Sequence, residues 1–188
     1  MVSLNIIHGT ITLRAIEERD LQFCFDMIND PQIEISTIGK NYPISSQQQR
    51  NWFLNGNDTN TVRLLIEVKN TGPVGMVMIS DINWINRTAE LGIKFCSGVA
   101  RERKDTENTT YAILWYVFNE MNLHCVYANV LKDNLFSRKL LLLNGFTEEG
   151  TLRARVYKRG TYHDIVVYSL LQDDFFKKNT KTVLEKKE

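Results

Sequence analysis

Apolar and polar residues alternate with a period of two in several stretches of the chain, as in β-strands with one buried face. We expect strands at residues 10–16, 61–69, 74–82, 88–96, 124–131, 146–157 and 163–171. Short turns separate the second, third and fourth of these stretches, which predicts an antiparallel meander. The last two stretches flank Gly160 and predict a closing hairpin.

Other stretches carry apolar residues at spacings of three and four, the period of a helix with one buried face. Leu114 and Phe118 mark one such face, and Phe136, Leu140 and Leu143 mark another. We expect helices within residues 17–30, 47–54, 106–121 and 134–144. The segment between the first two helices shows no clear period and is expected to be irregular.

The order of these elements places one β-α-β crossover at the centre of the chain, between the strands at 88–96 and 124–131. It predicts an α/β (α+β) fold in which a mixed, mostly antiparallel twisted sheet of about seven strands carries helices on both faces. At 188 residues we expect a single domain at 1–175, followed by a charged tail at 176–188 that is frayed or a short helix.

Composition limits the classes of function. The formal net charge of +1 argues against a protein that binds nucleic acid through overall basicity. No apolar run approaches the roughly 20 residues that span a bilayer, and the first residues lack a signal-peptide pattern, so we expect a cytoplasmic protein without membrane contact. The three widely spaced cysteines and three histidines predict neither a metal site nor a disulfide framework.

The segment before the central helix is rich in charge. Asp105 or Thr106 can cap that helix, whose free N–H groups and dipole favour an anion. Arg101, Arg103 and Lys104 add positive charge suited to a phosphate group. Three acidic residues among them leave the segment nearly neutral, so the residues alone slightly favour a solvated loop.

Longer stretches resemble the GNAT superfamily of N-acetyltransferases. The stretch "GMVMISDINWINRTAELGIKF" resembles the central hairpin of the family, and "ILWYVFNEMNLHCVYANVLKDNLFSRKLLLLNGF" resembles its crossover and second helix. With "GTLRARVYKRGTYHDIVVYSLL", the similarity extends over roughly residues 10–175 and is greatest for the ribosomal-protein and spermidine N-acetyltransferase branch. The resemblance implies the GNAT fold and acetyl-coenzyme A as co-substrate.

The resemblance also implies where coenzyme A binds. Its pyrophosphate position falls on residues 101–106, where Lys104 and Thr106 replace small residues of other members. Leu141 stands where many relatives have the tyrosine that protonates the leaving thiolate, so the general acid is unassigned; Cys125 and Tyr127 are candidates, with core positions as their alternative. We expect cofactor contacts from Phe95, Cys96, Arg101, Arg103, Lys104, Thr106, Asn134 and Ser137.

For the acceptor side, Glu90 is the expected catalytic base, because relatives place a carboxylate there and amine acetylation needs a proton acceptor. The alternative for Glu90 is an exposed structural glutamate. Further acceptor contacts are expected from Asn83, Trp84, Asn86, Tyr42 and Glu34. A plain turn is an equal alternative for the first three of these residues.

The predicted function is transfer of an acetyl group from acetyl-coenzyme A to a primary amine of a small molecule or a peptide N-terminus. A polyamine ranks lower, because only Glu34 and Glu90 supply acceptor-side carboxylates. The alternative is a degenerate GNAT domain that binds a ligand or partner without catalysis, which the Lys104 and Thr106 replacements motivate. A homodimer is left open.

Overall fold

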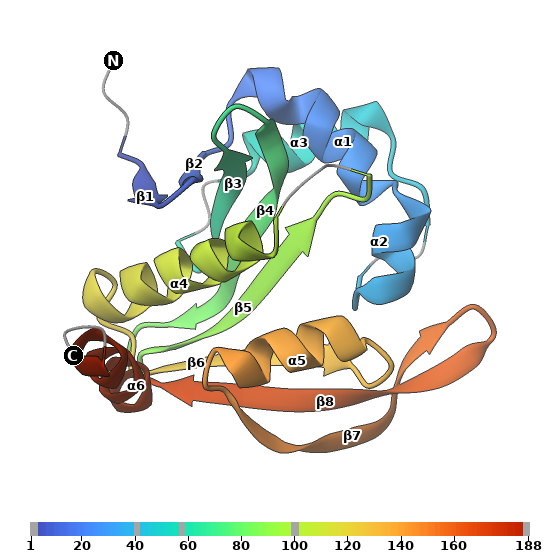
Figure 1. Ribbon diagram of the computed structural model, residues 1–188. Helices are drawn as coiled ribbons and strands as arrows, with labels where there is room; N and C mark the ends of the chain where they lie inside the picture. Colours follow the sequence, from blue (N-terminus) through green and yellow to red (C-terminus); the bar gives the residue numbers. More distant parts are fainter. Residues whose placement is uncertain (1–3, 40–41, 57–58, 99–101, 186–188) are drawn as a thin grey trace.

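The computed structural model describes residues 4–39, 42–56, 59–98 and 102–185, with side chains to 179. Its centre is one eight-stranded sheet in the order β1-β2-β3-β4-β5-β6-β8-β7 (Figure 1). The strands are β1 (Ile6–His8), β2 (Ile11–Ala15), β3 (Val62–Val68), β4 (Gly72–Asn83), β5 (Thr88–Phe95), β6 (Cys125–Leu131), β7 (Thr147–Lys158) and β8 (Thr161–Leu171). The prediction of about seven strands omitted the short edge strand β1, which pairs with β2.

Every strand pair is antiparallel except β5 and β6, which the crossover helix α4 (Arg103–Asn119) joins. Only three residues of each take part in the parallel pairing, Thr88–Glu90 against Cys125–Tyr127. Beyond that point the two strands diverge towards their carboxyl ends (Figure 1). The predicted crossover is therefore confirmed, and it leaves an opening in the middle of the sheet.

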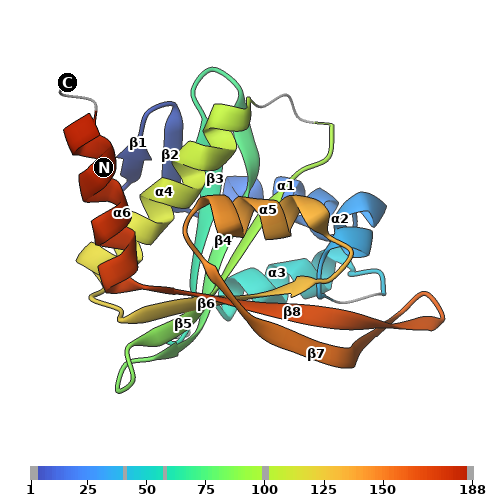
Figure 2. The same cartoon turned by 60° about the horizontal axis from the view of Figure 1, so that its bottom comes forward.

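The helices form a layer on each face of the sheet. Helices α4 and α5 (Leu135–Leu143) lie over one face, while α1 (Leu21–Ile28) and α3 (Ser46–Leu54) lie over the other, as the two views agree (Figure 2). The larger core joins the apolar face of α4, including Ile113 and Phe118, to alternate residues of the strands. No helix in the described part of the chain is long and apolar enough to cross a membrane.

One segment and one helix face differ from the sequence-based expectation. The segment expected to be irregular contains α2 (Pro31–Ser36), which starts where proline is favoured and where Asp30 accepts the Gln32 N–H at 2.8 Å. Helix α6 (Gln172–Glu185) begins before the expected tail and runs into it, and a short helix was one of the two alternatives for that tail. The predicted buried face of α5, with Phe136 and Leu143, was wrong. Leu141 is the buried residue of this helix, and Phe136 and Leu143 are exposed.

Helix α4 begins earlier than predicted. Its N-cap is Glu102, whose side chain accepts the Asp105 N–H, while the Asp105 carboxylate accepts the Glu102 N–H at 2.9 Å. This reciprocal capping box satisfies two N–H groups that the helix start would otherwise leave without partners. Asp105 also accepts a hydrogen bond from Thr10 across the sheet edge. The predicted caps Asp105 and Thr106 therefore lie inside the first turns, and both are buried.

Candidate functional site

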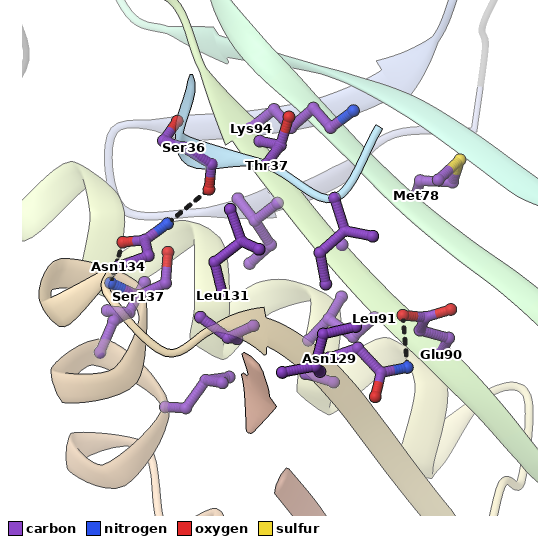
Figure 3. A pocket seen from close by; sticks show the side chains of 18 of the residues that line it. Ser36, Thr37, Met78, Glu90, Leu91, Lys94, Asn129, Leu131, Asn134 and Ser137 are labelled. Carbon is purple, nitrogen blue, oxygen red and sulfur yellow. Dashed lines mark hydrogen bonds between the residues drawn. The ribbon is translucent and has the colours of Figure 1, made fainter. Parts of the chain in front are cut away.

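The divergence of β5 and β6 opens a cavity of about 410 Å³, here called the fork cavity (Figure 3). Its volume lies in the range of small-ligand pockets. Strands β4 to β8, α4, α5 and the chain after α2 all contribute. The lining residues are Ser36, Thr37, Ile38, Met78, Ser80, Glu90, Leu91, Gly92, Ile93, Lys94, Thr110, Ala128, Asn129, Val130, Leu131, Asn134, Ser137, Leu140, Leu141, Leu152, Arg155 and Ile165.

Strand β5 gives the fork cavity two chemically different walls, because successive side chains of a strand point to opposite faces. Leu91 and Ile93 point towards α4 and join the core. Glu90, Gly92 and Lys94 share the other face. A carboxylate and an ammonium thus stand on one wall of the cavity, with a glycine between them.

Glu90 is held by a neighbouring strand. Its Oε1 accepts a hydrogen bond of 3.0 Å from Nδ2 of Asn129 on β6 (Figure 3). Asn129 belongs to the part of β6 that no longer pairs with β5, so this contact bridges the opening just beyond its apex. The amide orients the carboxylate and leaves its other oxygen available to a ligand.

The backbone of β5 also faces the opening. The Cys96 N–H donates to the Val74 carbonyl of β4 at 2.8 Å. Backbone groups alternate in direction along an antiparallel strand, so those of Leu91 and Ile93 point away from β4, towards the opening. In the described part of the chain, β6 pairs with no residue of β5 beyond Glu90. An extended ligand can therefore pair with this edge as a strand does.

Residues 36–38, here called the roof segment, close the fork cavity between α2 and α5. Asn134 Nδ2 donates to the Ser36 carbonyl at 2.8 Å (Figure 3). The buried Lys158 of the β7–β8 hairpin donates to the Thr37 carbonyl at 2.9 Å and to the Glu34 carbonyl. Lysine at the carboxyl end of a helix also suits the helix dipole. Two distant elements thus fix the roof segment.

Asn134 is also the N-cap of α5: its Oδ1 accepts the Ser137 N–H at 3.0 Å. This contact places the Ser137 side chain in the fork cavity (Figure 3). The neighbouring Leu141 lines the same cavity. The amino end of α5 therefore presents a hydroxyl group and an apolar side chain to the opening.

Two further cavities lie on the face of the sheet that carries Glu90. An inner cavity of about 300 Å³ shares Ile38, Met78, Gly92 and Lys94 with the fork cavity. Its other lining residues are Cys24, Ile28, Gly39, Ile44, Gln48, Gln49, Trp52 and Met76. An outer cavity of about 660 Å³ is lined by Phe25, Ile28, Asn29, Pro31, Glu34, Tyr42, Pro43, Ile44 and Arg159.

Glu34 and Tyr42, both expected to bind the acceptor, line the outer cavity. Glu34 is also held by ion pairs within the chain. Its carboxylate lies 2.9 Å from Nζ of Lys158 and 2.9 Å from a guanidinium nitrogen of Arg159. The hydrogen bonds from these two cations hold the pKa of Glu34 below its ordinary value, although burial acts in the opposite direction. Glu34 therefore carries a charge that its own chain already neutralises.

The expected pyrophosphate position is only partly described. Arg101 lies outside the described residues. Arg103 and Lys104 are exposed in the first turn of α4, and Nε of Arg103 lies 2.8 Å from the Glu107 carboxylate. Thr106 is 5% exposed and lies inside the helix, so its side chain faces the interior. Glu102 and Glu107 are exposed beside them, so this helix start carries exposed charge of both signs.

The structure brings three of the predicted residues together in the fork cavity: Glu90, Asn134 and Ser137. Phe95 and Cys96 lie at the end of β5, next to the cavity but not in its lining. The other three acceptor candidates lie in the β4–β5 turn, which lines none of the three cavities described above. They are Asn83, Trp84 and Asn86, with Asn86 donating its N–H to the Asn83 side chain at 2.8 Å.

Sequence reasoning missed Lys94, Asn129 and the roof segment. The period of two along β5 places Lys94 on the same face as Glu90, so this residue could have been found. Asn129 shares a face with Tyr127 in β6 by the same rule, but its contact with Glu90 depends on the point at which the strands separate. The roof segment depends on contacts more than 90 residues apart in the chain.

Comparison with known proteins agrees with this geometry. Residues 10–147 match the family model of the acetyltransferase (GNAT) domain. A spermidine N(1)-acetyltransferase of Vibrio cholerae is 27% identical over 176 residues, covering 92% of this chain and 99% of the relative.

Solved structures give the same result. The crystal structure of the Vibrio cholerae spermidine N-acetyltransferase in complex with CoA and spermine has a TM-score of 0.83 at 26% identity, covering 90% of this chain and 99% of that one. A dodecameric structure of that enzyme has a TM-score of 0.76 at 26% identity, with coverage of 89% and 97%. The expected fold and family are thus confirmed: this chain belongs to the GNAT family of acetyltransferases.

Proposed function

We propose that the chain transfers an acetyl group from acetyl-coenzyme A to a primary amine of a small molecule or a peptide N-terminus. The observation that carries the proposal is the fork cavity, in which a strand edge without a neighbouring strand and an oriented carboxylate meet at one point. The named Vibrio cholerae relative acts on an amine, and its structure holds CoA, which supports the same chemistry here.

The residues of the fork cavity suit a coenzyme A thioester. Backbone groups of Leu91 and Ile93 point into the opening and suit an extended, amide-containing arm. Beyond this edge, Arg103 and Lys104 stand exposed at the start of α4, where the helix dipole also favours anions. We assign the pyrophosphate to this end of the opening and the thioester to the end near Ser137. Acetyl-coenzyme A supplies the activated acetyl group.

Glu90 takes the proton of the acceptor amine. The amine nitrogen forms the new C–N bond, the C–S bond breaks, and the proton from nitrogen moves to the Glu90 carboxylate directly or through a water molecule. Asn129 holds that carboxylate in place through its hydrogen bond to Oε1. The Ser137 hydroxyl donates to the departing sulfur, a role that Leu141 lacks the chemistry to perform.

The proposal is tested by binding and by turnover in the same preparations. Saturation with acetyl-coenzyme A at 100 times its Kd stabilises a folded protein by about 2.7 kcal/mol. For a chain of this length that is a rise in Tm of roughly 5–11 °C. Turnover is followed as release of free thiol with a panel of primary amines. If acetyl-coenzyme A does not raise Tm, the chain is better described as the degenerate domain without catalysis.

Glu90→Gln separates the two steps of the proposal. We expect thiol release to fall by about 10²–10⁴-fold, because the general base is lost, while the Tm shift with acetyl-coenzyme A stays as in the parent. Glu120→Gln, an exposed glutamate just after α4, is the matched control and should change neither quantity. Unchanged turnover in Glu90→Gln would remove this residue from the mechanism.

A further inference from the structure

Lys94 is a cation that the acetyl-transfer mechanism does not use. It stands on the Glu90 face of β5 and lines both the fork cavity and the inner cavity. Within the described residues, its ammonium group has no ion pair or side-chain hydrogen bond. Burial and, secondarily, the charge of Lys158 lower the pKa of Lys94. A half-buried cation without a counter-ion is costly unless a ligand neutralises it.

The fork and inner cavities, here together called the acceptor chamber, carry more positive than negative charge around Lys94. Among the described residues that line the fork and inner cavities, Glu90 is the only acidic side chain, while Lys94 and Arg155 are basic. Of the further carboxylates, Asp81 is hydrogen-bonded to Tyr127 and lines neither cavity. Glu34 lines the outer cavity and is neutralised by Lys158 and Arg159. A polyamine needs several carboxylates, and this chamber offers one. A single ammonium group beside Glu90 with an anion beside Lys94 matches the charges present.

We propose that the acceptor is an amine that also carries an anionic group, and that Lys94 binds this group and selects against polyamines. This inference rests on the proposed function, because it assigns the acceptor amine to the Glu90 end of the cavity. Arg155, which is exposed on β7 at the rim, adds to the attraction. Gly92 leaves the space between the two charges open for the body of the acceptor.

The spacing of the two charges sets the size of the acceptor. Glu90 and Lys94 are four residues apart on one strand, so their Cα atoms lie about 13 Å apart. Both side chains are long and can lean towards one ligand, so the two charged groups can approach to about 10 Å, somewhat closer than the strand rise separates their Cα atoms. An extended chain of three residues spans about 10 Å. An N-terminal amine followed by an acidic residue within the first three positions has this spacing, and so has a free ω-amino acid.

The test uses three acceptors of equal length in the presence of acetyl-coenzyme A: 8-aminooctanoate, octylamine and 1,8-diaminooctane. They present a carboxylate, a methyl group and an ammonium group at the far end. A charge-assisted hydrogen bond predicts that 8-aminooctanoate has a kcat/KM about 10- to 100-fold above that of 1,8-diaminooctane. The same order is expected for Kd, measured by calorimetry with the coenzyme A complex.

Variants assign the preference to Lys94. Lys94→Gln should reduce the preference to within about threefold, and Lys94→Glu should reverse it in favour of 1,8-diaminooctane. Lys69→Gln, an exposed lysine at the end of β3 outside all three cavities, should leave it unchanged. If Lys94→Gln does not fold, Arg155→Gln on β7 provides a second test. This variant should reduce the preference for 8-aminooctanoate over 1,8-diaminooctane by about two- to fivefold.

The peptides Ala-Ala-Glu-amide and Ala-Ala-Lys-amide distinguish the source of the anion. Preference for Ala-Ala-Glu-amide over 8-aminooctanoate identifies a peptide N-terminus, and the reverse identifies a free amino acid; both support an anionic acceptor. Equal Kd values for 8-aminooctanoate and 1,8-diaminooctane, or a preference unchanged by Lys94→Gln, would overturn the inference. Thiol release with octylamine tests acetyl transfer separately, so that function can stand while the selectivity fails.

Discussion

Replacing Gly92 tests whether the fork and inner cavities together receive the acceptor. Gly92 lines both cavities and lies between Glu90 and Lys94 on β5. A Cβ atom added at Gly92 would meet only the Met78 carbonyl oxygen, at 3.8 Å, which is an ordinary van der Waals distance. The position lies inside a regular strand, so alanine adopts the backbone without strain.

The effect on stability can be estimated from the backbone alone. Glycine inside a strand is less favourable than alanine by roughly 0.5–1 kcal/mol, because it loses more conformational freedom on folding. One kcal/mol corresponds to about 2–4 °C in Tm for a domain of this size. Gly92→Ala should therefore raise Tm by about 1–4 °C. Gly92→Leu adds a larger side chain on the same open side and should change Tm by only a few degrees.

The effect on acceptor binding should run in the opposite direction. Leucine at position 92 fills the space through which the two cavities connect, so we expect KM for the acceptor to rise at least about tenfold, the equivalent of one displaced charge contact. The rise in Tm with acetyl-coenzyme A should persist, because the backbone groups of Leu91 and Ile93 lie at the edge of the strand, whereas a side chain at position 92 projects from one face of the sheet. Thermal unfolding and thiol release from the same samples measure both. Unchanged acceptor kinetics in a folded Gly92→Leu protein would refute the assignment of this chamber to the acceptor.

Two further predictions concern the charged contacts that hold the fold. Lys158→Met removes the contacts to the roof segment and should lower the free energy of unfolding by about 2–3 kcal/mol in urea titrations, with a higher acceptor KM; a loss below about 0.5 kcal/mol would show that the roof segment does not depend on it. Burial raises the pKa of Asp20, but hydrogen bonds from Arg14 and from the Glu17 N–H outweigh burial and hold the pKa below its ordinary value. Stability from this carboxylate is therefore complete above about pH 4 and lost as pH falls through the lower folded pKa, so Asp20→Asn should flatten the fall in unfolding free energy below pH 4, and an unchanged slope would contradict this.

Local patterns were sufficient to predict most of the architecture. Period-two stretches located seven of the eight strands, because apolar and polar residues alternate along them. The short strand Ile6–His8 was missed, since three residues are too few to show a period. The start of α4 was missed because its capping box reverses the usual order, with Glu102 at the cap and Asp105 three positions later. The contact of Asp105 with Thr10 involves residues 95 positions apart and leaves no local signal.

The site likewise combines residues that local patterns place with contacts between distant parts of the chain. Glu90 and Ser137 were expected in the site through the resemblance to the family, on a strand and a helix that the local pattern predicted, and both line the fork cavity. The contacts of Glu34 could not be predicted in this way: the sequence shows a carboxylate available for an acceptor, whereas the fold brings Lys158 and Arg159 against it. Whether a charged side chain faces a ligand or a partner within the chain is decided by distant contacts, which a period or a motif does not report.

The contact between Lys158 and the roof segment affects the order in which parts of the structure can form while the chain is being synthesised. Helix α2 has six residues, too few to be stable by itself, and the lysine that holds its carboxyl end is made more than 120 residues later. During synthesis the strands of the opening therefore emerge well before the chamber beside them can close. A chain that stops short of its last hairpin therefore lacks the lysine contacts that hold the roof segment over the opening.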